Sequence, residues 1–461
     1  MGFERGIRKI MSVQPEAARA NDVVTPAMWR LLWVSVSGVF LDGYDISIIA
    51  LALLQVKVQF RALPWQIGLV GSAILLGNFL GALVFGRLSD RLGRKTVFIA
   101  DVIFFVVFAL LSGISQNIWQ LMVWRFLLGV GIGGDYALAS PIIAEAMPAS
   151  KRGRMLTLNW GLAWLSGEIV SFAVGYGILH IAGPAAWRWM LASGAIPALV
   201  VLLIRRAMPE SARWLLAQGR HDDAKHAATQ LTGQASLSAL IPEVEGVQES
   251  TDHRPNVWRE LWGKYRRNTW YGLLNYVFEG APFYALSVFL PTILKQSGHA
   301  TTITGIAAGN LFLQLTGLFG ILLIFLWVDS KGRRFVNYWG YGGVLAALLA
   351  FELFSPPTPA LLIALFAVIE IAVWLGPAST DNLLLGELWP TRIRGTGAGI
   401  GAAMGRLSAI AGTFGLPVLI ASFGIDGAFW LLAIFCAFGI ANTAVLGIET
   451  KGKTLEQMWG L

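Results

Sequence analysis

The sequence predicts an all-α membrane protein in which twelve transmembrane helices form two pseudo-symmetric bundles of six. Three observations lead to this prediction. The 461 residues are 56% hydrophobic and only 13% charged, whereas soluble proteins carry about 25% charged residues. The apolar residues gather in long segments, and three polar motifs recur at nearly one spacing. This composition argues against a soluble enzyme or a disordered chain, and the single cysteine, Cys436, excludes an internal disulfide.

Each transmembrane helix needs about 20 mostly apolar residues, and twelve segments of the chain meet this requirement. They cover residues 28–54, 66–88, 96–115, 119–145, 156–182, 187–205, 268–294, 303–328, 335–355, 358–387, 396–423 and 427–447. The expected domain order is a tail (1–27), a first bundle (28–205), a linker with short helices (206–267), a second bundle (268–447) and a tail (448–461).

The positive residues predict how the chain lies in the membrane. Of the 35 Lys and Arg residues, 28 lie in the two tails and in the loops on one side of the predicted bilayer. The loops on the other side hold only Lys57, Arg61, Arg188 and Lys295. Because positive loops stay in the cytoplasm, we expect both termini, and the linker, on the cytoplasmic face of a bacterial inner membrane. This asymmetry accounts for the net charge of +8 without a nucleic-acid partner.

Three motifs recur between the two bundles. Residues 90–95 read DRLGRK and residues 329–334 read DSKGRR, 239 positions later. A second motif closes the fourth and tenth spans at an offset of 242, with the residues Glu145, Pro148, Arg152 and Gly153 matched by Glu387, Pro390, Arg394 and Gly395. Acidic motifs that begin near Glu210 and Glu449 follow the sixth and twelfth spans, again 239 apart. The chain is therefore expected to be a duplication with a substrate site where the halves meet.

The stretch from Gly86 to Lys95 resembles the signature loop of the major facilitator superfamily. The repeated Glu-x-x-Pro-x-x-x-Arg-Gly motif, PESARWLL and ETKGKTLEQ are similar to motifs of its sugar-porter and related metabolite branches. The resemblance covers about residues 28–457 and implies alternating access, in which one half rocks against the other.

Charged residues of these motifs are expected to pair where the cytoplasmic helix ends meet. Buried or partly buried pairs are costly to break, so they could hold one conformation and open in another. The predicted gating residues are Asp90, Arg91, Arg94, Glu145, Arg152, Glu210, Asp329, Arg333, Glu387, Arg394 and Glu449.

Ionisable residues inside the spans are candidates for function because a charge in the bilayer is costly. The first span holds Asp42 and Asp45, which share one face of a helix. Two carboxylates in one low-dielectric cavity repel, so at least one is expected to bind a proton near neutral pH. The fourth span supplies Arg125, and proton-linked sugar porters have a similar Asp and Arg. The resemblance therefore implies an Asp45–Arg125 coupling pair, with a purely structural ion pair as the alternative.

Two further motifs conflict on the substrate. Asp135, in a Gly-Gly-Asp-Tyr sequence, resembles phosphate/H+ symporters and is a third candidate for proton coupling, although Ala137 replaces the usual proline. The first-span aspartates instead resemble aromatic-acid/H+ symporters. Organic-anion carriers also resemble this chain in having an arginine in the eleventh span, here Arg406, which implies a contact with a substrate carboxylate. A salt bridge from Arg406 to Glu279, Glu370 or Asp381 is an equal alternative.

The glutamines that bind sugar hydroxyls in the seventh span of sugar porters are largely missing here. The candidate substrate-binding residues are Trp164, Glu168, Asn275, Glu279, Tyr284, Asn310, Gln314, Trp374, Asp381 and Arg406. We expect a monomeric proton symporter of a small organic or aromatic carboxylate that uses the proton gradient and no cofactor or metal. The alternatives are a sugar/H+ symporter, a phosphate/H+ symporter and a proton-driven exporter. A transceptor or a membrane enzyme would belong to another class, but no nucleophile–base pair is visible in the sequence.

Overall fold

The computed structural model describes residues 26–146, 158–206, 210, 214–215, 218–232, 257–296, 302–354 and 358–451. In these residues the regular elements are helices, as expected for long apolar segments in a membrane, where backbone groups must bond within the helix. The first half contains α2 (Pro26–Gln59), α3 (Pro64–Leu92), α4 (Arg94–Gly113), α5 (Ile118–Ala146), η1 (Leu158–Leu162), α7 (Ala163–Ala182), η2 (Gly183–Ala185), α8 (Ala186–Ser193) and α9 (Ala195–Arg206).

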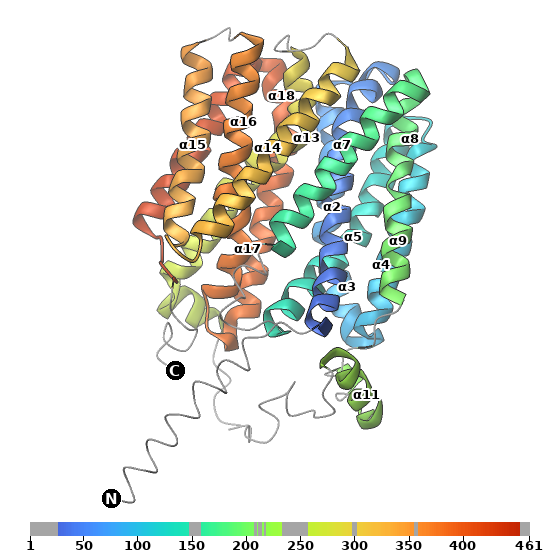
Figure 1. The fold of residues 1–461 in the computed structure, drawn as a ribbon, viewed down its shortest axis with the longest axis vertical. Coiled ribbons are helices and arrows are strands. Elements are labelled where there is room, and N and C mark those ends of the chain that lie inside the picture. Colours follow the sequence, from blue (N-terminus) through green and yellow to red (C-terminus); the bar gives the residue numbers. More distant parts are fainter. Residues whose placement is uncertain are drawn as a thin grey trace, which may run out of the picture.

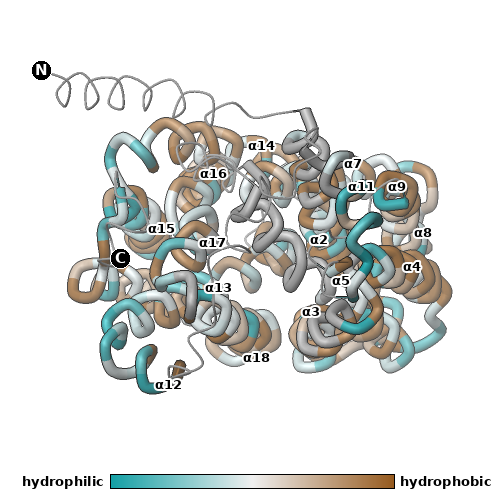
Figure 2. The backbone as a smooth tube through the Cα atoms, turned by 90° about the horizontal axis from the view of Figure 1, so that it is seen from below, coloured by the Kyte–Doolittle hydropathy of each residue, from teal (hydrophilic) through white to brown (hydrophobic). Residues whose placement is uncertain are grey.

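The second half begins after a segment that contains α11 (His221–Thr232), which lies below the first half in Figure 1. Its elements are α12 (Val257–Arg259), η4 (Glu260–Lys264), α13 (Arg266–Gln296), α14 (Ile303–Trp327), α15 (Arg333–Leu353), α16 (Pro359–Leu375), α17 (Pro377–Glu387) and α18 (Thr391–Val445). Figure 2 shows the two halves side by side, with α13 to α18 in one group and α2 to α9 in the other.

The helices account for twelve passes. Eight helical stretches are long and apolar enough to cross a membrane, and two of these, Trp160–Arg206 and Ile393–Val445, each run up and down the bundle. The helices α5 and α15 supply the remaining passes. The predicted all-α fold of twelve helices is therefore confirmed.

Two predicted spans differ in detail from the structure. The tenth span is divided into α16 and α17 at Gly376, because Pro377 lacks the N–H that a continuous helix would use. The eleventh and twelfth spans form one helical stretch, α18, that reverses at Gly424 with a φ of 73°. This left-handed conformation is accessible to glycine without a steric penalty.

The halves are tightly packed at the upper end of Figure 1, away from the end at which α2 begins. Every residue from Leu41 to Leu54 in α2, and from Glu279 to Pro291 in α13, is buried. These segments belong to one apolar cluster that spans both halves. The smaller clusters described at the lower end each belong to one half, such as the cluster of Phe85, Val97 and Phe98. The structure is therefore closed between its halves at the upper end.

Glycines allow the central helices to approach closely. A Cβ atom on Gly167 of α7 would lie 2.3 Å from the carbonyl oxygen of Phe40 and 2.7 Å from the amide nitrogen of Tyr44 in α2. Gly43 of α2 makes the reciprocal approach, since its Cβ would lie 2.3 Å from the Trp164 carbonyl oxygen. Backbone atoms cannot move aside cheaply, so both positions require glycine.

We expect Gly167→Ala to lower the stability of the protein by about 1–3 kcal/mol, because the added methyl group overpacks the α2–α7 contact. The measurement is the melting temperature of the purified protein in detergent. Gly177→Ala is the matched control, since Gly177 lies in the same helix and a Cβ there meets no atom within 4 Å. Equal melting temperatures for the two variants would contradict the packing argument.

Candidate functional site

The first two aspartates of the candidate site have different arginine partners. Asp45 of α2 and Arg125 of α5 are fully buried and form a two-pronged ion pair, with Nη1–Oδ1 at 2.8 Å and Nη2–Oδ2 at 2.6 Å. The structure therefore brings together the two residues that the resemblance paired. Because burial removes water from both ions, loss of either charge would leave the other without compensation.

Asp42, one turn before Asp45, lies near the opposite half of the molecule. Its Oδ2 atom is 3.9 Å from Nη2 of Arg406 in α18, and both residues are buried. Arg406 also donates a hydrogen bond of 2.6 Å to the hydroxyl of Tyr284 in α13. Asp42 is not among the salt-bridge partners predicted for Arg406 from the sequence, all of which are acidic residues of the second half. The Asp42–Arg406 pair joins the halves.

An aromatic layer adjoins this ion pair. Trp164 of α7 contacts Tyr284 and Phe283 of α13, with ring centroids 5.7 and 6.1 Å apart, and Phe283 contacts Trp374 of α16 at 5.6 Å. The layer therefore runs from the first half to the second through α13. Phe283 is the member of this layer that sequence reasoning missed, since one phenylalanine in an apolar span carries no distinguishing signal.

A second group of acidic residues lies one helical turn from the tryptophans. Glu168 of α7 is buried and accepts a hydrogen bond of 3.3 Å from Ser47, with Trp164 and Ser287 also beside its carboxyl group. Its charge interacts with that of Glu370 in α16, which lies beside Trp374. Glu370 of the second half therefore interacts with Glu168 of the first, whereas the ion pair described for Arg406 is with Asp42.

The second half contains a buried polar network below Arg406. Asn275 of α13 donates a hydrogen bond to Asp381 of α17, whose carboxyl group also lies within hydrogen-bonding distance of Glu279. Asn337 of α15 joins Asn275 to Thr380, which donates to the Asn337 side-chain oxygen at 2.6 Å. Three of the predicted substrate-binding residues are thus held in one network.

The structure gives less information about the function of the remaining predicted residues inside the spans. Asn310 is buried and donates to the Ile306 carbonyl of its own helix at 2.9 Å, which is a local contact. Gln314 lies one turn further along α14 and is also buried. The backbone of Asp135 belongs to α5, but its side chain lies outside the described residues.

The acidic motifs that follow the sixth and twelfth spans have equivalent positions in the two halves. The carboxylate of Glu210 accepts a hydrogen bond from the amide of Lys95, at the start of α4. The carboxylate of Glu449 accepts from the amides of Arg333 and Arg334, at the start of α15. A carboxylate at a helix N-terminus is favoured by the free N–H groups and the helix dipole.

The glycines of the repeated loops are explained by the same contacts. Gly93 and Gly332 precede α4 and α15 with φ angles of 93° and 102°, which are strained for other residues. A Cβ atom would lie 2.5 Å from Glu210 Oε2 at Gly93 and 2.4 Å from Glu449 Oε2 at Gly332. Both halves therefore have the same arrangement, in which a glycine leaves room for a glutamate from a distant segment to bind the N-terminus of a helix.

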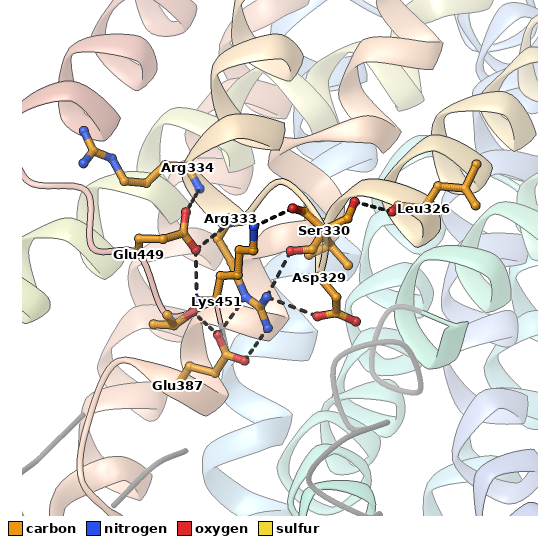
Figure 3. A network of polar contacts seen from close by, with 10 residues as sticks. Leu326, Asp329, Ser330, Arg333, Arg334, Glu387, Glu449 and Lys451 are labelled. Atoms are coloured by element: carbon orange, nitrogen blue, oxygen red, sulfur yellow. Dashed lines mark hydrogen bonds and ion pairs between the residues drawn. The ribbon is translucent and has the colours of Figure 1, made fainter. Parts of the chain in front are cut away.

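Arg333 is the centre of the lower-end network in the second half (Figure 3). Its guanidinium binds both oxygens of Glu387, at 2.9 and 3.1 Å, and Asp329 at 3.1 Å. Burial disfavours the charge of Arg333, but the Glu387 carboxylate outweighs it and raises the pKa of Arg333 above its ordinary value. These pairs all lie within the second half, so in this conformation they stabilise that half rather than join it to the other.

The other predicted gating residues divide into two groups. Arg91 is exposed, and Arg394 donates to the Trp389 carbonyl at 3.1 Å within the second half. The side chains of Asp90, Arg94 and Glu145, and all of Arg152, lie outside the described residues. Their gating role stays a prediction.

Glu387→Gln is expected to lower the stability of the protein by about 2 kcal/mol, because it removes a charged hydrogen-bond partner of the buried Arg333. The melting temperature of the purified protein measures this effect. Asp223→Asn provides the control, since the Asp223–Arg220 pair is more than half exposed and such pairs contribute little. A Glu387→Gln variant as stable as this control would show that the pair contributes nothing.

The comparisons with known proteins agree with this architecture. The family model "Sugar (and other) transporter" matches residues 31–459. The inner membrane metabolite transport protein YgcS of Escherichia coli (strain K12) is 31% identical over 414 residues, which cover 90% of each chain. The niacin transporter NiaP of Acinetobacter baylyi (strain ATCC 33305 / BD413 / ADP1) is 28% identical and covers 93% of this chain and 96% of its own.

The fold is also similar to that of a solved structure. The proton:xylose symporter XylE of the major facilitator superfamily, bound to 6-bromo-6-deoxy-D-glucose, superimposes with a TM-score of 0.75. The match covers 94% of this chain and 98% of the symporter at 23% identity, which establishes a common fold. Together with the family match over nearly the whole chain, this shows that the protein is a multi-pass membrane transporter that belongs to the sugar (and other) transporter family and has the fold of the major facilitator superfamily.

Proposed function

We propose that the protein is a proton-coupled symporter that carries a small organic carboxylate, with an aromatic carboxylate as the best fit. The observation that carries this proposal is Arg406, a buried cation that lies 3.9 Å from the Asp42 carboxylate of the other half. That separation is long for a charged hydrogen bond, so a substrate carboxylate could compete with Asp42 for the guanidinium. Tyr284 would hold Arg406 in position during the exchange, through its 2.6 Å hydrogen bond.

The aromatic layer supports a flat substrate. Trp164, Phe283 and Trp374 connect the halves beside Arg406, and planar rings favour offset or edge-to-face contacts with other rings. The relative NiaP carries niacin by name, and niacin combines an aromatic ring with a carboxylate. Glu168, Gln314 and Asn310 would then provide polar contacts for substituents on the ring.

The Asp45–Arg125 pair is the proposed coupling element. Protonation of Asp45 would neutralise one partner of a fully buried ion pair and release Arg125. Because this changes the packing of α2 against α5, proton binding could bias the rocking of the halves. Asp135 is a further proton candidate on α5.

We also propose alternating access, with the lower end of Figure 1 facing the cytoplasm. The seal between the halves at the upper end would then represent a state closed to the outside. The gating residues of the repeated loops would pair across the halves when the lower end closes. The positive-inside rule favours cytoplasmic positions for both termini, and the transporter is expected to work as a monomer in a bacterial inner membrane.

A sugar/H+ symporter is the second candidate, because the family and the proton:xylose symporter favour it. A phosphate/H+ symporter and a proton-driven exporter are retained as weaker alternatives. Arg406 separates the anionic substrates, a carboxylate or phosphate, from a sugar, since a neutral sugar has no need of a buried cation.

The proposed function is tested by uptake into proteoliposomes that contain the full chain, with an inward proton gradient. We expect uptake of radiolabelled nicotinate above that of empty liposomes, and loss of accumulation when a protonophore collapses the gradient. D-xylose and inorganic phosphate are the competing probes. Gradient-driven uptake of D-xylose without nicotinate uptake would replace the carboxylate proposal with the sugar one.

A further inference from the structure

The carboxyl groups of Glu279 and Asp381 form a contact that the proposed coupling pair leaves unexplained. Glu279 comes from α13 and Asp381 from α17, and both side chains are more than nine-tenths buried. They lie within hydrogen-bonding distance of each other. Two ionised carboxylates have only acceptor atoms, so this contact requires a proton on one of them.

A second observation points to the same proton. Asn275 donates to Oδ1 of Asp381, whereas the buried Oδ2 has no protein N–H or O–H donor among the described residues. A buried acceptor without a donor is costly. A proton on this side of Asp381, directed to the Glu279 carboxylate, supplies the missing hydrogen bond.

The local charge balance supports this assignment. The carboxyl groups of Asp42 and Glu279 both interact with Arg406, the described guanidinium of this site, and Asp381 interacts in turn with Glu279. The other titratable groups described as interacting with the two acids are the tyrosines 271, 276 and 341, which are neutral near pH 7. Full ionisation would leave two uncompensated negative charges in a buried site.

We propose that Glu279 and Asp381 share one proton and form a second proton site, in the half opposite to the Asp45–Arg125 pair. The shared proton leaves one negative charge on the pair, so Arg406 can also attract Asp42 across the interface. Loss of the proton would double the negative charge beside Arg406, draw its guanidinium toward Glu279 and weaken the contact with Asp42. Proton occupancy of the second half would thereby be linked to the contact between the halves.

The proton is detected without any substrate by infrared difference spectroscopy of the full chain in lipid at neutral pH. The carbonyl stretch of a protonated carboxylic acid is separate from the bands of a carboxylate and shifts in D2O. We expect Glu279→Gln and Asp381→Asn each to remove the same single band, and the double variant to remove nothing more. Asp223→Asn, a change at an exposed carboxylate, is expected to leave the band in place.

Two outcomes would overturn the shared proton. Either no protonated-acid band is lost in the two variants, or each variant removes a different band, which would mean two separately protonated acids. Both single variants are expected to lose the same protonated-acid band, so one of them suffices if the other fails to fold. Because the spectra need no substrate, this result is independent of whether nicotinate is transported.

The transport consequence rests on the proposed symport. If the second site carries a coupled proton, Glu279→Gln is expected to lower the accumulation of nicotinate by about tenfold for each unit of pH gradient. Exchange of labelled for unlabelled nicotinate is expected to persist, since it requires no net proton movement. An unchanged accumulation ratio, with the band lost, would show that the proton is bound but not transported.

Discussion

Asp45→Asn is expected to remove the nicotinate accumulation that is driven by the proton at Asp45, a loss of about tenfold for each unit of pH gradient. The amide cannot exchange a proton with the solution, yet it can still accept a hydrogen bond from Arg125. Counterflow of nicotinate, which needs only alternation of the loaded carrier, is expected to continue. The two assays together separate coupling from movement of the halves.

Stability has to be controlled in this experiment, because Asp45 and Arg125 are fully buried. Removing one charge of such a pair costs about 3–5 kcal/mol. The double variant Asp45→Asn with Arg125→Gln removes both charges, and we expect it to regain stability without regaining accumulation. Proton-driven accumulation by Asp45→Asn at the wild-type level would refute the coupling role.

A second buried ion pair offers a matched comparison in the same half. Asp101 of α4 and Arg205 of α9 are buried, 3.0 Å apart, and Arg205 also stacks on Phe98. This pair joins α4 to α9, two helices that carry no residue of the aromatic layer and not Arg406. Asp101→Asn is expected to lower stability but to retain accumulation by the folded protein, so that loss of a buried charge alone does not mimic uncoupling.

The fold was predictable because hydropathy and duplication are properties of contiguous sequence. Span lengths identified the helices, and the offset between DRLGRK and DSKGRR identified the halves. The positions of Gly93 and Gly332 within these motifs are now explained by two glutamates that approach from distant segments. The sequence could show that the motif repeats, but not which remote side chain makes the glycine necessary.

Which residues belong to the site was largely predictable from the sequence, whereas most of their ion-pair and hydrogen-bond partners were not. The Asp45–Arg125 pair was expected, since family resemblance supplied both partners. Asp42 was expected to share a cavity with Asp45, but its nearest described cation is Arg406, from a helix of the other half. Helical periodicity places two side chains on one face of their own helix, whereas their partners depend on how separate helices pack. Glu279 and Asp381 were predicted only as substrate-binding residues, because their mutual contact depends on how α13 packs against α17.

Arg406→Gln is expected to weaken nicotinate binding by about a hundredfold, which corresponds to about 3 kcal/mol for a buried charged contact. Glutamine preserves part of the length and polarity of the side chain but removes its charge. The measurement is the dissociation constant of nicotinate for the purified transporter, obtained by isothermal titration calorimetry. Arg406→Lys retains a charge without the planar two-pronged donor, so an intermediate loss is expected.

Tyr284→Phe is the partner variant, since it removes only the hydroxyl that receives the 2.6 Å hydrogen bond from Arg406. Loss of this one bond is expected to cost about 1–2 kcal/mol and to leave carboxylate selectivity intact. The order of the binding affinities of these variants tests whether Arg406 binds the substrate carboxylate. If Arg406→Gln binds nicotinate as the wild type does, Arg406 serves only the Asp42 contact between the halves. If D-xylose binds equally well to all the variants, the buried cation is structural and the substrate is a neutral sugar.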